Sequence, residues 1–252
     1  MLDRVLVLSG LDPSGGAGIA ADIETINQFG VTPLPVVTTL TAQNTQVVSA
    51  IQAVDHALIE QQLTALADDT SINTVKIGLL SSVEQINTIA HWLNENHLVV
   101  LDPVIKASTA DVMLDENMLK ALRASLLPMV TLLTPNMAEL QALAPDLDEQ
   151  SAVATLPCEW VLLTTTDISD QIIEHRLYHQ SNLVERFSYP KLPGQYHGSG
   201  CTLASAISAL LASQIDVKNA VKRALDYTYQ TLLNAKRIGK MQYHPNRAKP
   251  LT

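Results

Sequence analysis

The sequence predicts one α/β domain built on a doubly wound, mostly parallel sheet with helices on both faces. Short apolar segments that look like strands alternate with helical segments along the chain, which is the pattern of a parallel sheet with crossover helices. The composition supports a large core, because 47% of the 252 residues are apolar and only 16% are charged. We see no internal repeat, low-complexity tract or convincing linker, so we expect a single domain over residues 1–252.

The first half of the chain follows this alternation closely. Arg4–Ser9 is a nearly continuous apolar run of the kind that is buried in a parallel sheet. The glycine-rich residues 10–18 then turn the chain into a helix that runs to about Phe29. A strand over residues 31–40 and a polar loop over residues 41–45 follow. The next expected elements are a helix over 55–67, a strand over 74–77, a helix that ends near Trp92, a strand over 98–101 and a helix over 115–125.

The second half adds an antiparallel edge. A strand over residues 130–133 stops where a helix carrying Glu139 begins, and the next strand covers residues 160–163. Two alternating segments joined by polar residues, 172–178 and 183–189, predict a β-hairpin. Two helices over about 198–213 and 217–238 close the fold, and residues 243–252 are expected to form a loose tail.

The net charge and the number of cysteines indicate which partners the protein can bind and which cellular compartment suits it. The formal net charge of −9 argues against nucleic-acid binding. Half of the basic residues gather between Lys218 and Lys249, which indicates a solvated helix face or, alternatively, the neighbourhood of a polyphosphate. Two cysteines, Cys158 and Cys201, suit a reducing compartment, and no signal peptide or spanning segment is visible. We therefore expect a cytoplasmic protein with no membrane partner.

The strongest local signal is the segment Tyr-His-Gly-Ser-Gly-Cys-Thr-Leu-Ala over residues 196–204. Gly198 and Gly200 permit a sharp turn just before a helix, and the free N–H groups and dipole at a helix N-terminus favour an anion. Cys201 lies in or beside the first turn, a position that lowers the pKa of a thiol. We interpret the segment as a base next to a phosphate site. A tight loop with a small buried cysteine is the alternative.

Small, polar and acidic residues follow the expected strands, at the edge where parallel sheets bind ligands. Asp102 and Glu139 follow neighbouring strands and could share one Mg²⁺, a cation that takes few protein oxygens; each alone could equally be a loop carboxylate or a helix cap. Patterns of P-loop, dinucleotide-binding, zinc-protease and nucleophile-elbow proteins are absent. The residues at this edge are Gly10, Asp12, Gln43, Asn44, Gly78, Asp102, Asn136, Glu139, Thr164 to Asp167 and Gly198 to Cys201.

Several motifs together resemble the hydroxymethylpyrimidine/phosphomethylpyrimidine kinases of thiamine biosynthesis. They occur in the order of that family and spread over nearly the whole chain, at residues 10–22, 42–45, 76–80, 102–104, 134–139 and 197–203. The resemblance implies a three-layer, ribokinase-like fold. It also implies phosphoryl transfer that depends on ATP and Mg²⁺, an aminopyrimidine substrate and a homodimer.

The resemblance also assigns roles to residues. It places Gly10, Asp22 and Gln43 around the aminopyrimidine, with apolar contacts from Leu79 and Val104; Asp22 alone could equally be a solvated helix acid. Further expected roles are Mg²⁺ organisation by Asp102 and Glu139, nucleotide binding by Asn136, Thr164 and Ser199, an anion hole over Gly198, Ser199 and Gly200, and a catalytic base at Cys201.

Two departures from the family pattern affect the phosphate side. The chain has Thr164-Thr-Thr-Asp167 where the family usually has Lys-Gly-Gly-His, whose lysine reaches the ATP phosphates. It also has Ser108-Thr-Ala-Asp111 in place of Lys-Ser-Gly-Asp, although Lys106 lies nearby. We expect weaker ATP binding or turnover, a substitute cation from elsewhere, or loss of one of two phosphorylation steps.

Three functions therefore compete. The leading hypothesis is a kinase that phosphorylates 4-amino-5-hydroxymethyl-2-methylpyrimidine and then its monophosphate. A pyridoxal or pyridoxine kinase is the alternative among enzymes, since that ring also carries a hydroxymethyl group. A non-catalytic pyrimidine-binding protein is the third, motivated by the missing lysine at position 164.

Overall fold

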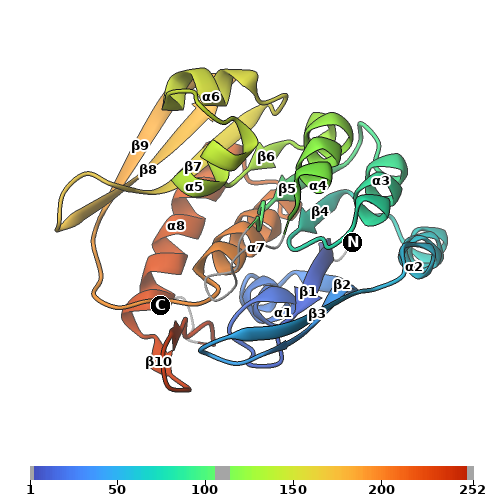
Figure 1. Ribbon diagram of the computed structural model, residues 1–252, viewed down its shortest axis with the longest axis horizontal. Coiled ribbons are helices and arrows are strands. Elements are labelled where there is room, and N and C mark those ends of the chain that lie inside the picture. The colour runs from blue at the N-terminus through green and yellow to red at the C-terminus, as the bar shows by residue number, and fades with distance from the viewer. Residues whose placement is uncertain (1–2, 106–113, 249–252) are drawn as a thin grey trace.

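The computed structural model describes residues 3–105 and 114–248, and its centre is a single nine-stranded sheet (Figure 1). Its strands are β1 (Arg4–Leu11), β2 (Thr32–Gln43), β3 (Val48–Ala53), β4 (Thr74–Ile77), β5 (Leu98–Leu101), β6 (Leu132–Leu133), β7 (Trp160–Asp167), β8 (Ile172–His179) and β9 (Asn182–Pro190). They lie in the order β3-β2-β1-β4-β5-β6-β7-β8-β9. The six strands from β2 to β7 in this order are mutually parallel, and β3, β8 and β9 pair antiparallel at the edges.

Helices cover both faces of the sheet, and β1 shows why. Val5 and Val7 pack toward one face and Leu6 and Leu8 toward the other, and all four are fully buried. The core under Leu6 and Leu8 is closed by α2 (His56–Asp69), α3 (Val83–Trp92), α4 (Glu116–Ala121), α5 (Met137–Leu143) and α6 (Glu149–Thr155). The opposite core is closed by α1 (Gly18–Gln28), α7 (Ser199–Ala212) and α8 (Val217–Leu233). The three-layer α/β fold predicted from the sequence is confirmed.

Several element boundaries differ from the sequence expectation. β2 continues through most of the segment expected as a loop, and β3 pairs back onto it, although residues 48–53 carry no clear alternation. Helix α6 was not predicted either. The helix expected over 115–125 divides into α4 and a π-helical turn (Leu122–Leu126), and the last helix ends at Leu233 instead of residue 238. Beyond it, β10 (Lys236–Arg237) pairs with β11 (Tyr243–His244).

The expected loose tail is wrong for residues 243–248. The Tyr243 amide donates to the Gln195 carbonyl and its carbonyl accepts from His197, each at 2.9 Å. The Asn246 amide donates to Thr231 at 3.0 Å, and Arg247 is 2% exposed. A terminal segment is ordered when such contacts tie it down, and a sequence pattern does not reveal them. None of the described helices is long and apolar enough to cross a membrane.

Candidate active site

A cavity of about 440 Å³ opens at the carboxyl ends of the parallel strands, as the strand-end argument predicts. Residues from β1, β2 and β7, from the turns after β4, β5 and β6, and from the start of α7 form its wall. Of the residues singled out from the sequence for binding or catalysis, it gathers Gly10, Gln43, Leu79, Asp102, Val104, Asn136, Glu139, Thr164, Gly198, Ser199, Gly200 and Cys201. Lys106 and residues 108–111 lie outside the described part of the chain.

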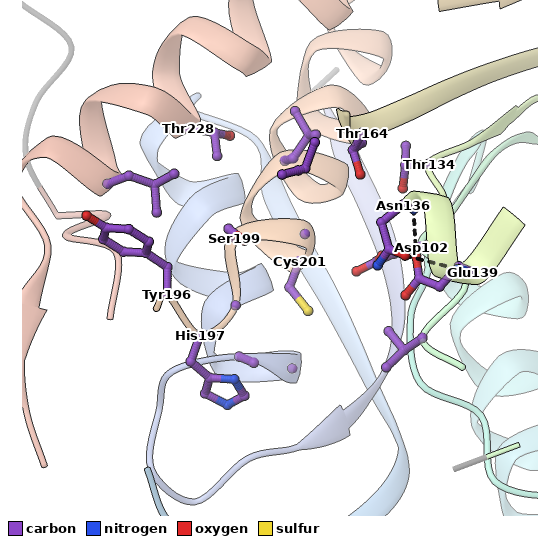
Figure 2. A pocket seen from close by; sticks show the side chains of 18 of the residues that line it. Asp102, Thr134, Asn136, Glu139, Thr164, Tyr196, His197, Ser199, Cys201 and Thr228 are labelled. Carbon is purple, nitrogen blue, oxygen red and sulfur yellow. Dashed lines mark hydrogen bonds between the residues drawn. The ribbon is translucent and has the colours of Figure 1, made fainter. Parts of the chain in front are cut away.

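The part of the cavity that is suited to a phosphate is the N-terminus of α7. Gly198 precedes the helix with φ 83°, a left-handed conformation that favours glycine. A Cβ atom there would lie 1.9 Å from the Gly16 carbonyl oxygen, so a side chain is excluded by contact as well. Because Gly198 has no side chain to cap the helix, the first-turn amides remain available to an anion. Figure 2 shows this turn, with Ser199 and Cys201, at the cavity.

Cys201 does not have the low pKa that its helix position suggested. Burial raises the pKa of the thiol to about 12, and the neighbouring carboxylates of Asp102 and Asp22 act in the same direction. The charge of Lys76 and a hydrogen bond from the Gly18 amide act in the opposite direction and do not compensate. In the protein without ligands, Cys201 is therefore a neutral thiol, and it donates a hydrogen bond to Asp102.

Asp22 lies beneath the cavity and is not part of its wall. Its carboxylate is fully buried, forms an ion pair with Lys76 at 2.9 Å and accepts a hydrogen bond from Ser205 at 2.7 Å. Lys76 is buried too, and the adjacent carboxylates hold its pKa above the usual value in spite of the burial. The sequence suggested a substrate contact or a solvated helix acid at this position, and in the structure the carboxylate is instead bonded to the buried Lys76 and to Ser205.

The buried Asp102 and the half-buried Glu139 form a pair of carboxyl groups in the cavity wall. Glu139 and Asn136 cap α5 reciprocally: the Asn136 amide donates to Glu139 at 2.8 Å, and the Glu139 amide donates to the Asn136 side chain at 3.0 Å (Figure 2). Burial and the neighbouring charge of Asp102 raise the pKa of Glu139 to about 8. Burial likewise raises the pKa of Asp102. Two carboxylates that disfavour each other's charge are suited to share a divalent cation.

Asp12 belongs to the same edge of the sheet but is already occupied. It accepts hydrogen bonds from the Ser14 amide at 2.8 Å and the Ala17 amide at 2.9 Å, and from His197 at 2.9 Å. Burial opposes its charge, but the hydrogen bonds from His197 and Ser14 hold the pKa of Asp12 well below its usual range. Asp12 therefore shapes the glycine-rich loop and connects it to the residue that precedes Gly198.

The other end of the cavity was not found from the sequence. The β8–β9 hairpin and α8 contribute apolar and aromatic side chains there, and Thr164 donates its backbone amide to Pro135 at 2.8 Å. Among the described residues that line the cavity, Lys191 is the only lysine or arginine, and it pairs with the exposed Asp167 at 2.9 Å. No sequence motif marks the residues that the hairpin and α8 contribute. The alternation of apolar and polar residues in the hairpin predicts strands but not a place in a cavity wall. The additional lining residues are Ile173, His175, Tyr189, Leu192, Leu225, Thr228, Tyr229 and Leu232.

The fold and the cavity together define a class of protein. A parallel α/β sheet, a glycine turn at a helix N-terminus and two carboxyl groups at neighbouring strand ends are the parts of a kinase that transfers a phosphoryl group. The family model described as phosphomethylpyrimidine kinase matches residues 12–246, and the chain belongs to this family. The resemblance identified from the sequence is thereby confirmed.

Individual relatives agree with this assignment. The hydroxymethylpyrimidine/phosphomethylpyrimidine kinase of Salmonella typhimurium is 36% identical over 219 residues, covering 82% of each chain. An ADP complex of pyridoxal kinase from Bacillus subtilis has a TM-score of 0.86 at 25% identity and covers 98% of each chain. A phosphomethylpyrimidine kinase from Clostridium difficile 630 has a TM-score of 0.76 at 28% identity, covering 91% of this chain and 99% of its own. These neighbours confirm the ribokinase-like kinase fold and support ATP as the phosphoryl donor.

Proposed function

We propose that this kinase uses ATP and Mg²⁺ to phosphorylate 4-amino-5-hydroxymethyl-2-methylpyrimidine and then its monophosphate. The observation that carries the proposal is the single cavity that gathers the family's substrate, metal and anion-hole positions, Asp22 excepted. The family membership and the name of the Salmonella typhimurium relative support the same substrates. In this proposal the pyrimidine lies between Leu79 and Val104, and Gln43 recognises its polar edge.

The proposed reaction is an in-line displacement. The substrate hydroxyl oxygen attacks the γ-phosphorus of ATP, and the bond to the ADP oxygen breaks. Because Cys201 is a neutral thiol before ligands bind, it must first release its own proton to solvent, and the thiolate so formed then accepts the proton of the substrate hydroxyl. The amides of Ser199, Gly200 and Cys201 stabilise the charge on the transferred group. Asp102 and Glu139 are the residues that would hold Mg²⁺. The metal would neutralise phosphate charge and remove the mutual repulsion of the two carboxylates.

The experiment is ADP release from Mg-ATP by the purified chain, with hydroxymethylpyrimidine, its monophosphate or pyridoxal as acceptor. Turnover on both pyrimidines supports the proposal. The pyridoxal kinase of Bacillus subtilis shares the fold, so higher kcat/KM on pyridoxal would replace the proposal by its alternative. Pyrimidine binding in calorimetry without ADP release on any acceptor would favour a non-catalytic binding protein.

We further propose that the chain acts as a homodimer in the cytoplasm. The β2–β3 hairpin exposes apolar side chains, with Leu40 and Ile51 each 42% and Val47 47% exposed, which is a surface that a second copy can cover. Both cysteines are free thiols, in keeping with a reducing compartment. Light scattering during size-exclusion chromatography tests the dimer; a monomer mass at micromolar concentration would contradict it.

A further inference from the structure

Arg247 is a buried cation at the end of the chain that contacts two functional loops at once. We name them the glycine-rich loop (residues 12–18) and the anion-hole loop (residues 198–201). Its guanidinium donates to the carbonyls of Gly15, at 3.4 Å, and Gly16 in the first loop, and to the Thr202 hydroxyl, at 2.8 Å, directly after the second. The Thr202 hydroxyl in turn donates to the Gly198 carbonyl at 2.8 Å.

The two loops touch where Arg247 binds them. A Cβ atom on Gly198 would lie 1.9 Å from the Gly16 carbonyl oxygen and 2.8 Å from an Arg247 nitrogen. One backbone therefore lies directly on the other, with the guanidinium beside the contact. The glycine-rich loop contributes Asp12, Ala17 and Gly18 to the cavity wall, and all four residues of the anion-hole loop line the same cavity.

We infer that Arg247 is a positioning residue that fixes the glycine-rich loop against the anion-hole loop and so aligns the acceptor with the transferred phosphoryl group. The inference rests on the proposed function. It assigns a role in the reaction to the C-terminal segment (residues 243–248), which the sequence suggested was a loose tail.

The chemistry of arginine suits this role. A planar guanidinium presents five N–H donors in a fixed fork, so it can reach acceptors on several elements at once; a lysine ammonium is a point donor on a flexible stem. The carboxylate that pairs with Arg247 is Glu24, at 3.3 Å, and its side chain is 55% exposed, whereas that of Arg247 is 1% exposed. The buried contacts of the guanidinium are thus made directly to the glycine-rich loop and, through Thr202, to the anion-hole loop, and Glu24 contributes little.

Hydrogen bonds to its backbone hold the segment that carries Arg247 in place. The Tyr227 hydroxyl on α8 donates to the Arg247 carbonyl at 3.1 Å. The Asn246 amide is bonded to Thr231 on the same helix, and Tyr243 exchanges hydrogen bonds with residues 195 and 197 just before the anion-hole loop. These bonds hold the backbone of Arg247 on α8, so the guanidinium keeps a fixed position relative to both loops.

The test compares Arg247→Gln and Arg247→Lys with a matched control, Arg123→Gln, which removes an arginine that is bonded to the Ala142 carbonyl at 3.4 Å, outside the cavity wall. For each variant we would measure kcat and KM, the Kd of ADP and of the pyrimidine by calorimetry, and amide hydrogen exchange in residues 10–18 and 197–203. Each loop keeps its own ligand contacts, so both Kd values should stay within about threefold of the wild type. Misalignment of the reacting groups should lower kcat by about 100-fold in Arg247→Gln and by about tenfold or more in Arg247→Lys.

The outcomes separate positioning from simple stabilisation. A kcat for both Arg247 variants within about threefold of the Arg123→Gln value would overturn the inference, as would a loss of both binding affinities with normal kcat at saturation. If the wild type releases no ADP with any acceptor, the proposed function fails, and hydrogen exchange still decides the inference. Faster exchange in both loops of Arg247→Lys, with neither changed in Arg123→Gln, supports the connection, and unchanged exchange in either loop refutes it.

Discussion

The acceptor groups of the two proposed steps differ in acidity, which gives Cys201 a selective role. The first acceptor is an alcohol whose proton must be removed. The second is a phosphate monoester whose second pKa is about 6, so at pH 8 its oxygen is already ionised. Cys201→Ala should therefore impair the first step far more than the second, because only the first needs a base.

The size of the loss of kcat in Cys201→Ala follows from the groups that surround the sulfur. Cys201 is enclosed with Asp102, Asp22 and Lys76, and Asp22 and Lys76 are bonded to each other at 2.9 Å. Asp102 belongs to the expected metal pair, so no free base remains in this cluster to replace the sulfur. A positioned base contributes about 10²–10⁴-fold, and we expect a loss of that size in kcat on hydroxymethylpyrimidine and a loss below about tenfold on its monophosphate.

The assay is ADP release at pH 8 with each acceptor at saturation, for wild type, Cys201→Ala and a Cys158→Ala control. Cys158 is also a free thiol whose pKa is raised to about 12 by partial burial, but it donates to the Leu127 carbonyl and is not in the cavity wall. Equal losses on both acceptors in Cys201→Ala would refute the acid–base role and leave only a packing role for the sulfur. A loss in the Cys158 control of the same size would indicate general damage.

Three other predictions follow from the charges of the site. Thr164→Lys should lower the KM for ATP by about tenfold with little change in the KM for pyrimidine, because a charge-assisted phosphate contact is restored; unchanged steady-state KM values would contradict this. Lys76→Met should lower the free energy of unfolding by about 3–5 kcal/mol in urea titrations, since Asp22 is left buried without its partner, and adding Asp22→Asn should recover most of the loss. Because the pKa of Glu139 is raised to about 8, below that pH Mg²⁺ must displace a proton, so the Mg²⁺ affinity from calorimetry should rise as the pH increases toward 8 and lose this dependence in Glu139→Gln. A flat pH profile in the wild type would refute the assignment.

The sequence predicted the location of the site better than its internal electrostatics. Strand ends are visible as the points where apolar runs stop, so residues such as Gly10, Asp102 and Asn136 could be assigned to one edge of the sheet before their contacts were known. The pKa of Cys201 was misjudged because a helix position is a local property, whereas enclosure by three other elements is not. The buried ion pair of Asp22 was not predicted for the same reason, since its partner Lys76 is 54 residues away in the chain.

The parts of the fold that the sequence missed depend on partners distant in the chain. Arg247 is ordered by carbonyl groups more than 200 residues earlier, and no local pattern encodes such an acceptor. β3 forms because β2 offers an edge, although residues 48–53 are largely exposed and carry no core pattern. The end of the cavity beside the β8–β9 hairpin and α8 is built from single residues of these elements, and their sequence periodicity predicts only strand or helix structure, not a place in a cavity wall.

The balance of charge in the cavity bears on how ATP binds without a lysine at position 164. Asp102 and Glu139 face a space in which Lys191 is the only lysine or arginine among the described lining residues, and Lys191 is bonded to Asp167 at 2.9 Å. Lys76 lies below this wall and is neutralised by Asp22. A triphosphate that enters the cavity therefore meets few compensating side chains. We expect its charge to be balanced by the α7 amides and by the divalent cation that it brings, so that ADP should bind measurably only when Mg²⁺ is present.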